Sequence, residues 1–475
     1  MTRGEPPAGA GNGADACGDP PFRSAPVGRR GLTLHLLLVI AATLGIAGHS
    51  AAAAVGRDHW RPRPADAAPT DPSTAARPGA TDRSLYAGPK SARSPRPGDP
   101  VGVRRTWLAG SLQAALNRQA AALLAGDEGT FVGIADPALA PELHRRFADL
   151  RALRVTGWEE TLAGDPQPVP DPSGVQRWRV AVRVRYCFAE PDCVPAPLTN
   201  QTEWADDGDG EPRLVALRPS EGGEAGPRPW EVSDLRVVAG NRVIVAAPAP
   251  LAGRLSAALA TAERAAAVTD RYVRWGPPPG RYLVFFAGPD EWTRWYGVHE
   301  PSWVAGYAQP VGDWSTEVIM NAQRLGTGDD VLLDTLRHEF THVVTLAGVR
   351  RDYSTAWWLV EGMAEYVRMV GRPLDEYTGL AATHRYVHSG HWTGDIALTV
   401  PADGASLDDA TGRYGVAMLA LRRIAGRYGE DKLLAFFAAV VRDGTDPVAA
   451  APAVLGADWA SVAADCAWSV RRDVA

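Results

Sequence analysis

Two histidines and a glutamate within one short segment have the residue types and the spacing of a catalytic metal site. The segment HEFTH places His338 and His342 four residues apart, with Glu339 directly after the first histidine. Residues four apart lie on one face of a helix, so both imidazoles can bind one zinc ion while the glutamate reaches a water on that ion. The segment therefore predicts a zinc site with His338 and His342 as ligands and Glu339 as the general base.

The residues around this segment predict a buried helix over 331–347. Apolar side chains recur there at the spacing that one helix face requires: Leu332, Leu333, Leu336, Phe340, Val343, Val344 and Ala347. The structural alternative is a helix whose histidines and glutamate are satisfied by neighbouring polar groups. Asp334, one turn before His338, either supports a ligand from behind or is an ordinary acidic residue on the helix face, and the second interpretation is preferred.

A catalytic zinc site normally has three protein ligands and leaves its fourth position to water, so a third ligand is expected. The segment AWWLVEGMAEY at 356–366 supplies two carboxylates on one helix face, Glu361 and Glu365. HEFTH followed by WLVEGMAEY resembles the gluzincin metallopeptidases, specifically the membrane-associated peptidase MA-like family. The resemblance covers about 250–475, roughly half of the chain.

The resemblance implies an enzyme that uses one Zn²⁺ ion to hydrolyse peptide bonds in a peptide or protein substrate. It makes Glu361 the third metal ligand, and Glu365 the residue that hydrogen-bonds a ligand imidazole and fixes its tautomer. The segment RYGVAMLALRRIAGRYGEDKLLAFF at 413–437 resembles the C-terminal helix of the family. Tyr414 matches the tyrosine that opens this helix, which implies that it donates a hydrogen bond to the oxyanion. A core tyrosine is the alternative.

The elements that position this site belong to a domain predicted at 250–475. Apolar periodicity predicts a helix over 255–266 and strands at 281–286 and 317–320. The edge of the second strand, extended to 321, is a candidate for pairing with an extended substrate. Three further histidines are interpreted as surface residues because no carboxylate pattern accompanies them: His384, His388 and His391.

A smaller α+β domain is predicted at 106–247. Apolar periodicity predicts helices at 107–123 and 140–153, and the alternation of apolar and basic residues predicts a strand at 178–186. Further strands are expected later in this range, at 214–217, 232–238 and 243–246. Two helices followed by a curved antiparallel sheet resemble the nuclear-transport-factor-2-like (NTF2-like) domains, and no catalytic pattern accompanies them.

An uncharged segment near the N-terminus predicts export. The chain carries no charged residue from 32 to 55, and two arginines, Arg29 and Arg30, precede this range. The segment is long enough to cross a bilayer, and the arginines favour a cytoplasmic N-terminus. We interpret 31–55 as a single-pass anchor, with a cleaved signal peptide and a secreted protein as the alternative. A buried helix of a cytosolic protein is the remaining interpretation.

The predicted fold class is α+β, and the chain is predicted to contain five consecutive parts. They are a disordered cytoplasmic leader at 1–30, a transmembrane helix at 31–55, a disordered Pro/Arg-rich linker at 56–105, the NTF2-like α+β domain at 106–247, and a mainly helical gluzincin-type metallopeptidase domain with a small sheet at 250–475.

Composition argues against two other classes of protein. Forty-nine basic and fifty-five acidic residues give a formal charge of −6, which does not favour a nucleic-acid partner. The four cysteines form no paired C-x-x-C pattern, which argues against a thiolate zinc site. Cys187 and Cys193 either form a disulfide or remain free thiols. No oligomeric state is predicted.

A second function class remains beside the membrane-anchored peptidase. It is a catalytically silent, zinc-holding binding or sensing module at the cell surface. The presence of Glu339 favours the enzyme, because a purely structural zinc site has no use for a general base.

Overall fold

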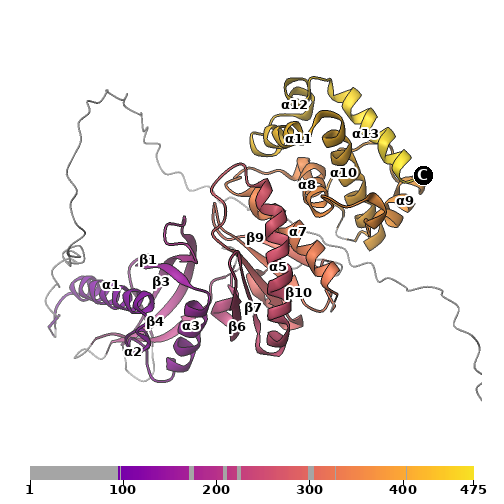
Figure 1. Ribbon diagram of the computed structural model, residues 1–475. Coiled ribbons are helices and arrows are strands. Elements are labelled where there is room, and N and C mark those ends of the chain that lie inside the picture. Colours follow the sequence, from indigo (N-terminus) through magenta and orange to yellow (C-terminus); the bar gives the residue numbers. More distant parts are fainter. Residues whose placement is uncertain are drawn as a thin grey trace, which may run out of the picture. The chain divides into compact units, whose positions relative to one another are not determined.

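The computed structural model describes residues 95–475 apart from 97, 171–175, 207–210, 222–225, 298–303, 327 and 403 (Figure 1). The leader and the membrane segment predicted at 1–30 and 31–55 lie outside the described residues, as do residues 56–94 of the predicted linker. The first described helix, α1 (Val101–Ala125), begins within the range predicted as linker. Residues 102–107 of this helix are exposed or half-buried, so apolar periodicity does not reveal them.

No single helix in the described part of the chain is long and apolar enough to cross a membrane. Two C-terminal helices, α12 (Pro447–Val454) and α13 (Trp459–Asp473), meet the length and composition requirement only together, and they are bent by 90° at their junction.

The first sheet follows three helices, of which α1 and α3 confirm the helices predicted at 107–123 and 140–153. Its strands pair in the order β1-β3-β4-β5, all antiparallel, and β2 pairs with β3. The apolar residues that alternate along β3 are buried, from Trp178 to Tyr186. The elements are α2 (Glu128–Val132), α3 (Ala140–Ala152), β1 (Val155–Leu162), β2 (Gln167–Val169), β3 (Gln176–Phe188), β4 (Ala196–Asp206) and β5 (Arg213–Arg218).

A disulfide joins Cys187, near the end of β3, to Cys193. The sequence left open whether these cysteines form a disulfide or remain free thiols, and in the structure they form the disulfide. It lies in the connection between β3 and β4. Cys466 is buried and free.

The second sheet has the strand order β6-β7-β8-β10-β9. Strands β7, β8 and β10 are parallel neighbours, whereas β6 and β9 pair antiparallel at the two ends. The bounds are β6 (Leu235–Ala239), β7 (Val243–Pro248), β8 (Tyr282–Ala287), β9 (Gly306–Pro310) and β10 (Thr316–Asn321).

This sheet differs from the prediction in two respects. The strands predicted at 232–238 and 243–246 were assigned to the first domain, yet β6 and β7 belong to the second sheet. All six residues of β7 are buried, as expected of a strand with neighbours on both sides. The strand predicted at 317–320 is β10, which lies between β8 and β9. The prediction that this strand forms an edge for substrate pairing is therefore wrong. The edge strand beside it is β9.

Helices α5 (Leu255–Thr269) and α7 (Asp329–Leu346) pack against each other and against the second sheet (Figure 1). The long helix α10 (Leu407–Tyr428) packs against α8 (Trp357–Arg368), α9 (Leu380–His388) and α13. The helix α10 begins at Leu407, before the range predicted from 413, because Ser406 caps it by accepting a hydrogen bond from the Asp409 amide. Other helices are α4 (Pro229–Val232), α6 (Pro289–Arg294) and α11 (Glu430–Phe437).

Candidate metal centre

Helix α7 carries His338, Glu339 and His342 and confirms the helix predicted at 331–347. Two aspartates in its first turn, Asp329 and Asp330, interact favourably with the helix dipole. Its apolar side packs on the sheet, where Phe340 stacks on Tyr282 of β8 with ring centroids 4.0 Å apart. This packing orients the helix so that both histidine side chains are buried on its other side.

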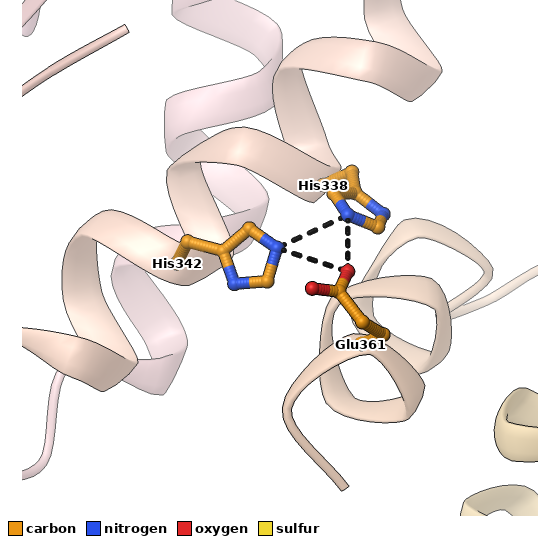
Figure 2. Close-up of side chains that lie close together, drawn as sticks. All are labelled: His338, His342 and Glu361. Atoms are coloured by element: carbon orange, nitrogen blue, oxygen red, sulfur yellow. Dashed lines mark hydrogen bonds and ion pairs between the residues drawn. The ribbon is translucent and has the colours of Figure 1, made fainter. Parts of the chain in front are cut away.

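The structure brings the three predicted ligands together (Figure 2). Nε2 of His338 lies 3.1 Å from Nε2 of His342 and 3.1 Å from Oε2 of Glu361. The same carboxylate oxygen lies 3.4 Å from Nε2 of His342. His338 and Glu361 have no exposed surface and His342 is 2% exposed, so the three groups face one another away from solvent.

These separations fit one zinc ion. In a tetrahedral site with bonds of about 2.0–2.2 Å, ligand atoms lie about 3.3–3.6 Å apart, within a few tenths of an ångström of the distances here. Oε1 of Glu361 is buried and has no hydrogen-bond partner among the described residues, which leaves the whole carboxylate available to a cation. Two imidazoles and one carboxylate are also a donor set that zinc accepts.

Glu365 fixes the orientation of the first ligand. Its Oε1 lies 2.8 Å from Nδ1 of His338, on the side of the ring that faces away from the other two ligands. A carboxylate can only accept there, so Nδ1 carries a proton, and Nε2 is the nitrogen that faces Glu361 and His342 and would bind a metal ion. Glu365 therefore makes the contact with a histidine ring that the resemblance to the gluzincins implies.

Behind Glu365 lies a chain of ion pairs that the sequence analysis did not find. Arg368 donates to both oxygens of Glu365 at 3.1 Å and to Asp334 at 3.3 Å. Arg372 donates to the other oxygen of Asp334 at 2.7 Å. Asp334 is thus a buried link in this chain, and its interpretation as an ordinary acid on the helix face is wrong. The i, i+3 spacing of Glu365 and Arg368 was the available signal.

The pKa values of these groups reflect burial opposed by close partners. Burial disfavours the charged form of Glu365, but Arg368 and the hydrogen bond with His338 outweigh it and lower its pKa to about 2. The two imidazoles likewise overcome burial and lower the pKa of Glu361. Burial lowers the pKa of His342. The lowered pKa of Glu361 favours its ionised form, which suits a divalent cation.

Glu339 and Tyr414 both lie close to His338. Glu339 is buried on α7. Burial alone would lower the pKa of His338, but the hydrogen bonds with Glu361 and Glu365 and the charge of Glu339 outweigh it and raise this pKa. The ring centroid of Tyr414 lies 6.1 Å from that of His338 and 5.0 Å from that of Trp357. These contacts place Tyr414 in the core beside the site, and its role toward an oxyanion stays a prediction.

A cavity of about 440 Å³ is lined in part by His342, one of the three predicted metal ligands. One wall contains Ala308 and Pro310 of the edge strand β9, and the other contains Arg350 and Tyr353 from the segment after α7. A substrate could therefore approach the metal group along the edge of the second sheet.

Among the described residues, His338, His342 and Glu361 form the only group with a geometry that could hold a metal ion. His384 and His388 stack on the surface of α9 with ring centroids 4.3 Å apart, and His391 is exposed after this helix. This agrees with their interpretation as surface residues. Comparison of the sequence with models of protein families and with curated proteins gave no match.

Proposed function

We propose that this chain is a zinc-dependent peptidase of the gluzincin type, with His338, His342 and Glu361 as metal ligands. The observation that carries the proposal is the convergence of two imidazole nitrogens and one carboxylate oxygen at separations of 3.1–3.4 Å. Catalytic zinc sites use such a set of three ligands and keep the fourth position for water or substrate. The resemblance of HEFTH and WLVEGMAEY to the gluzincins supports the peptide bond as the substrate bond.

The residues around the ligands have distinct tasks in this proposal. Bound zinc would polarise the substrate carbonyl and lower the pKa of water to about 7. Glu339 would accept the proton of the attacking water and return it to the leaving amine. Glu365 would keep His338 in the tautomer that binds metal through Nε2, and Tyr414 would donate a hydrogen bond to the developing oxyanion.

The cavity at His342 is the proposed place of the substrate. Strand β9 pairs only with β10 in the described sheet, so its outer edge can pair with an extended peptide. A peptide added there would pass beside His342, because Ala308 and Pro310 line the same cavity as this ligand.

The proposed enzyme acts outside the cytoplasm, anchored by the apolar segment 31–55 or secreted after its removal. The disulfide between Cys187 and Cys193 supports this location, because such bonds persist mainly in oxidising compartments.

The test is cleavage of a mixed peptide library by the full-length zinc-loaded chain. We expect Glu339→Gln to bind zinc as the wild type does and to lose at least about 100-fold in kcat/KM, because it removes the general base. Glu376→Gln, at an exposed glutamate on the same domain, is the matched control. Cleavage that survives in Glu339→Gln would refute the mechanism. A wild type that binds zinc and cleaves nothing would favour the binding module.

A further inference from the structure

A second cavity, of about 560 Å³, lies away from the three metal ligands. It is formed by the short helix η4 (Asp270–Tyr272) and the residue Arg274 after it, the C-terminal end of α8 with the turn that follows, and the second half of α10. Four arginines line it: Arg271, Arg274, Arg372 and Arg422. Glu430 is the acidic residue among the lining residues, so four positive charges face one negative charge. We call this cavity the arginine cavity.

Most of this positive charge is not neutralised by the described residues. Arg372 forms an ion pair with Asp334. No ion pair joins Arg271, Arg274 or Arg422 to any acidic residue in the described part of the chain. Within the described part of the chain, Arg271 and Arg274 each donate one side-chain hydrogen bond, to the backbone oxygens of Val268 and Val273, at 3.3 and 3.4 Å. Each of these two guanidinium groups therefore keeps most of its donors for a ligand.

Glu430 does not compensate the arginines, because its hydrogen bonds come from tyrosines. The hydroxyls of Tyr272 and Tyr366 both donate to Oε1 of Glu430, at 2.7 and 3.0 Å. The carboxylate is thus bound by two neutral donors and forms no ion pair with the lining arginines in the described part of the chain. The cavity therefore keeps an excess of positive charge.

We propose that the arginine cavity binds an anion of the phosphate class, either in a soluble molecule or in a lipid headgroup. The planar guanidinium group offers paired N–H donors that match the oxygens of a phosphoryl group, and several such groups together favour a multiply charged anion. The cavity is larger than one phosphate ion requires. Apolar side chains, among them Met369, Val370 and Met418, line its remainder, which suits a diphosphate or a phosphate ester with an organic part.

Arg372 lies in both the arginine cavity and the ion-pair chain that leads through Asp334 and Arg368 to Glu365. Its substitution would disturb the metal site as well as the cavity. Arg271 and Arg422 have no such link, so they are the residues to change. Because neither forms a hydrogen bond or ion pair with His338, His342 or Glu361 in the described part of the chain, the proposal can be tested by binding alone, whether or not the chain is a peptidase.

The test is calorimetric titration of the full-length chain, after chelation of metal, with inorganic pyrophosphate at constant ionic strength. We expect binding to one site, with Arg271→Gln and Arg422→Gln each raising Kd at least about 10-fold. Arg183→Gln is the matched control, since Arg183 is exposed on β3 and has no ion pair with the described residues. Circular dichroism and thermal unfolding establish that the variants are folded.

A fourth variant tests the sign of the charge effect. Glu430→Gln keeps an oxygen that accepts from Tyr272 and Tyr366 but removes the negative charge, so pyrophosphate should bind more tightly. Vesicles with and without phosphatidylglycerol distinguish a lipid headgroup from a soluble phosphate; binding to either source that is lost in Arg422→Gln supports the proposal. Absence of binding to both sources, or equal weakening by Arg183→Gln, would overturn it. Weaker binding by Glu430→Gln would overturn it too.

Discussion

Glu365 connects the proposed metal ligand His338 to buried charges that the sequence motifs do not reveal. Helical spacing was sufficient to predict that His338 and His342 share one helix face and that Glu361 and Glu365 share another. The roles of Glu361 and Glu365 came from the resemblance of HEFTH with WLVEGMAEY to the gluzincins. Arg368 and Asp334 come from two different helices, so their contact depends on how α7 and α8 pack. The sequence could not predict that packing, and it therefore missed the chain of ion pairs behind the site.

The role of Glu365 gives a direct prediction for metal affinity. Glu365→Gln keeps the size of the side chain but removes the charge that holds His338 and pairs with Arg368. We expect zinc affinity to fall about 10- to 100-fold, the usual effect of losing such a partner of a ligand. Competition with a chromogenic chelator measures it. Unchanged affinity would contradict the assigned role, and Glu376→Gln is the exposed control on the same domain.

Glu160 on β1 predicts how the stability of the chain depends on pH. Burial raises the pKa of Glu160 to about 7, although Arg146 partly opposes this. Unfolding exposes the carboxyl group and returns its pKa to about 4.5. Between these two values the folded state holds more proton, so the free energy of unfolding falls as pH rises from about 4.5 to about 7, and it receives no further change from this group above that range.

Glu160→Gln should remove this pH-dependent loss in the free energy of unfolding. We expect the free energy of unfolding of the variant, minus that of the wild type, to rise by roughly 1–3 kcal/mol between pH 4.5 and pH 8. Urea denaturation at both pH values measures this difference. Glu159→Gln, at the exposed neighbour, should show no such trend. A difference between wild type and Glu160→Gln that is the same at both pH values would contradict the prediction.

Helices α8 and α10 approach closely next to a metal ligand. A Cβ atom on Gly362 would lie 3.0 Å from the backbone oxygen of Ala417 and 3.0 Å from Cδ1 of Leu421. Glycine at this position therefore lets α8 lie against α10, which sets the place of Glu361 one residue earlier. The closeness of two helices at one residue is a tertiary feature, and the sequence EGMAE gives it no separate signal.

Gly362→Ala should push the two helices apart. We expect a loss of about 1–3 kcal/mol in the free energy of unfolding, as for other overpacked cores, together with weaker zinc binding because Glu361 moves. Denaturant unfolding and zinc titration measure the two effects. Gly110→Ala on α1 is the matched control, since a Cβ there meets no atom within 4 Å and a helical alanine is favourable. A variant as stable as the wild type would refute the close approach.

Over the whole chain, the sequence predicts individual helices and strands better than it predicts which strands pair in a sheet. Apolar periodicity and short apolar segments located about half of the described helices and strands, including α1, α3, α5, α7, β3, β7 and β8, and missed others such as β1, β4 and β9. It did not assign β6 and β7 to the correct sheet. A hairpin that follows one domain can pair with a later strand, and here β7 pairs with β8 across the intervening helix α5. Strand neighbours depend on such distant contacts, so the boundary near 247 was misplaced.

The zinc content of the purified full-length chain, measured by inductively coupled plasma mass spectrometry, shows whether His338, His342 and Glu361 hold a metal ion. We expect one zinc per chain for the wild type and for Glu339→Gln, and a nearly complete loss in His342→Ala and Glu361→Gln. His384→Ala, which changes an exposed histidine of α9, should keep its zinc. A wild type without zinc, or a His342→Ala variant that retains it, would contradict the account.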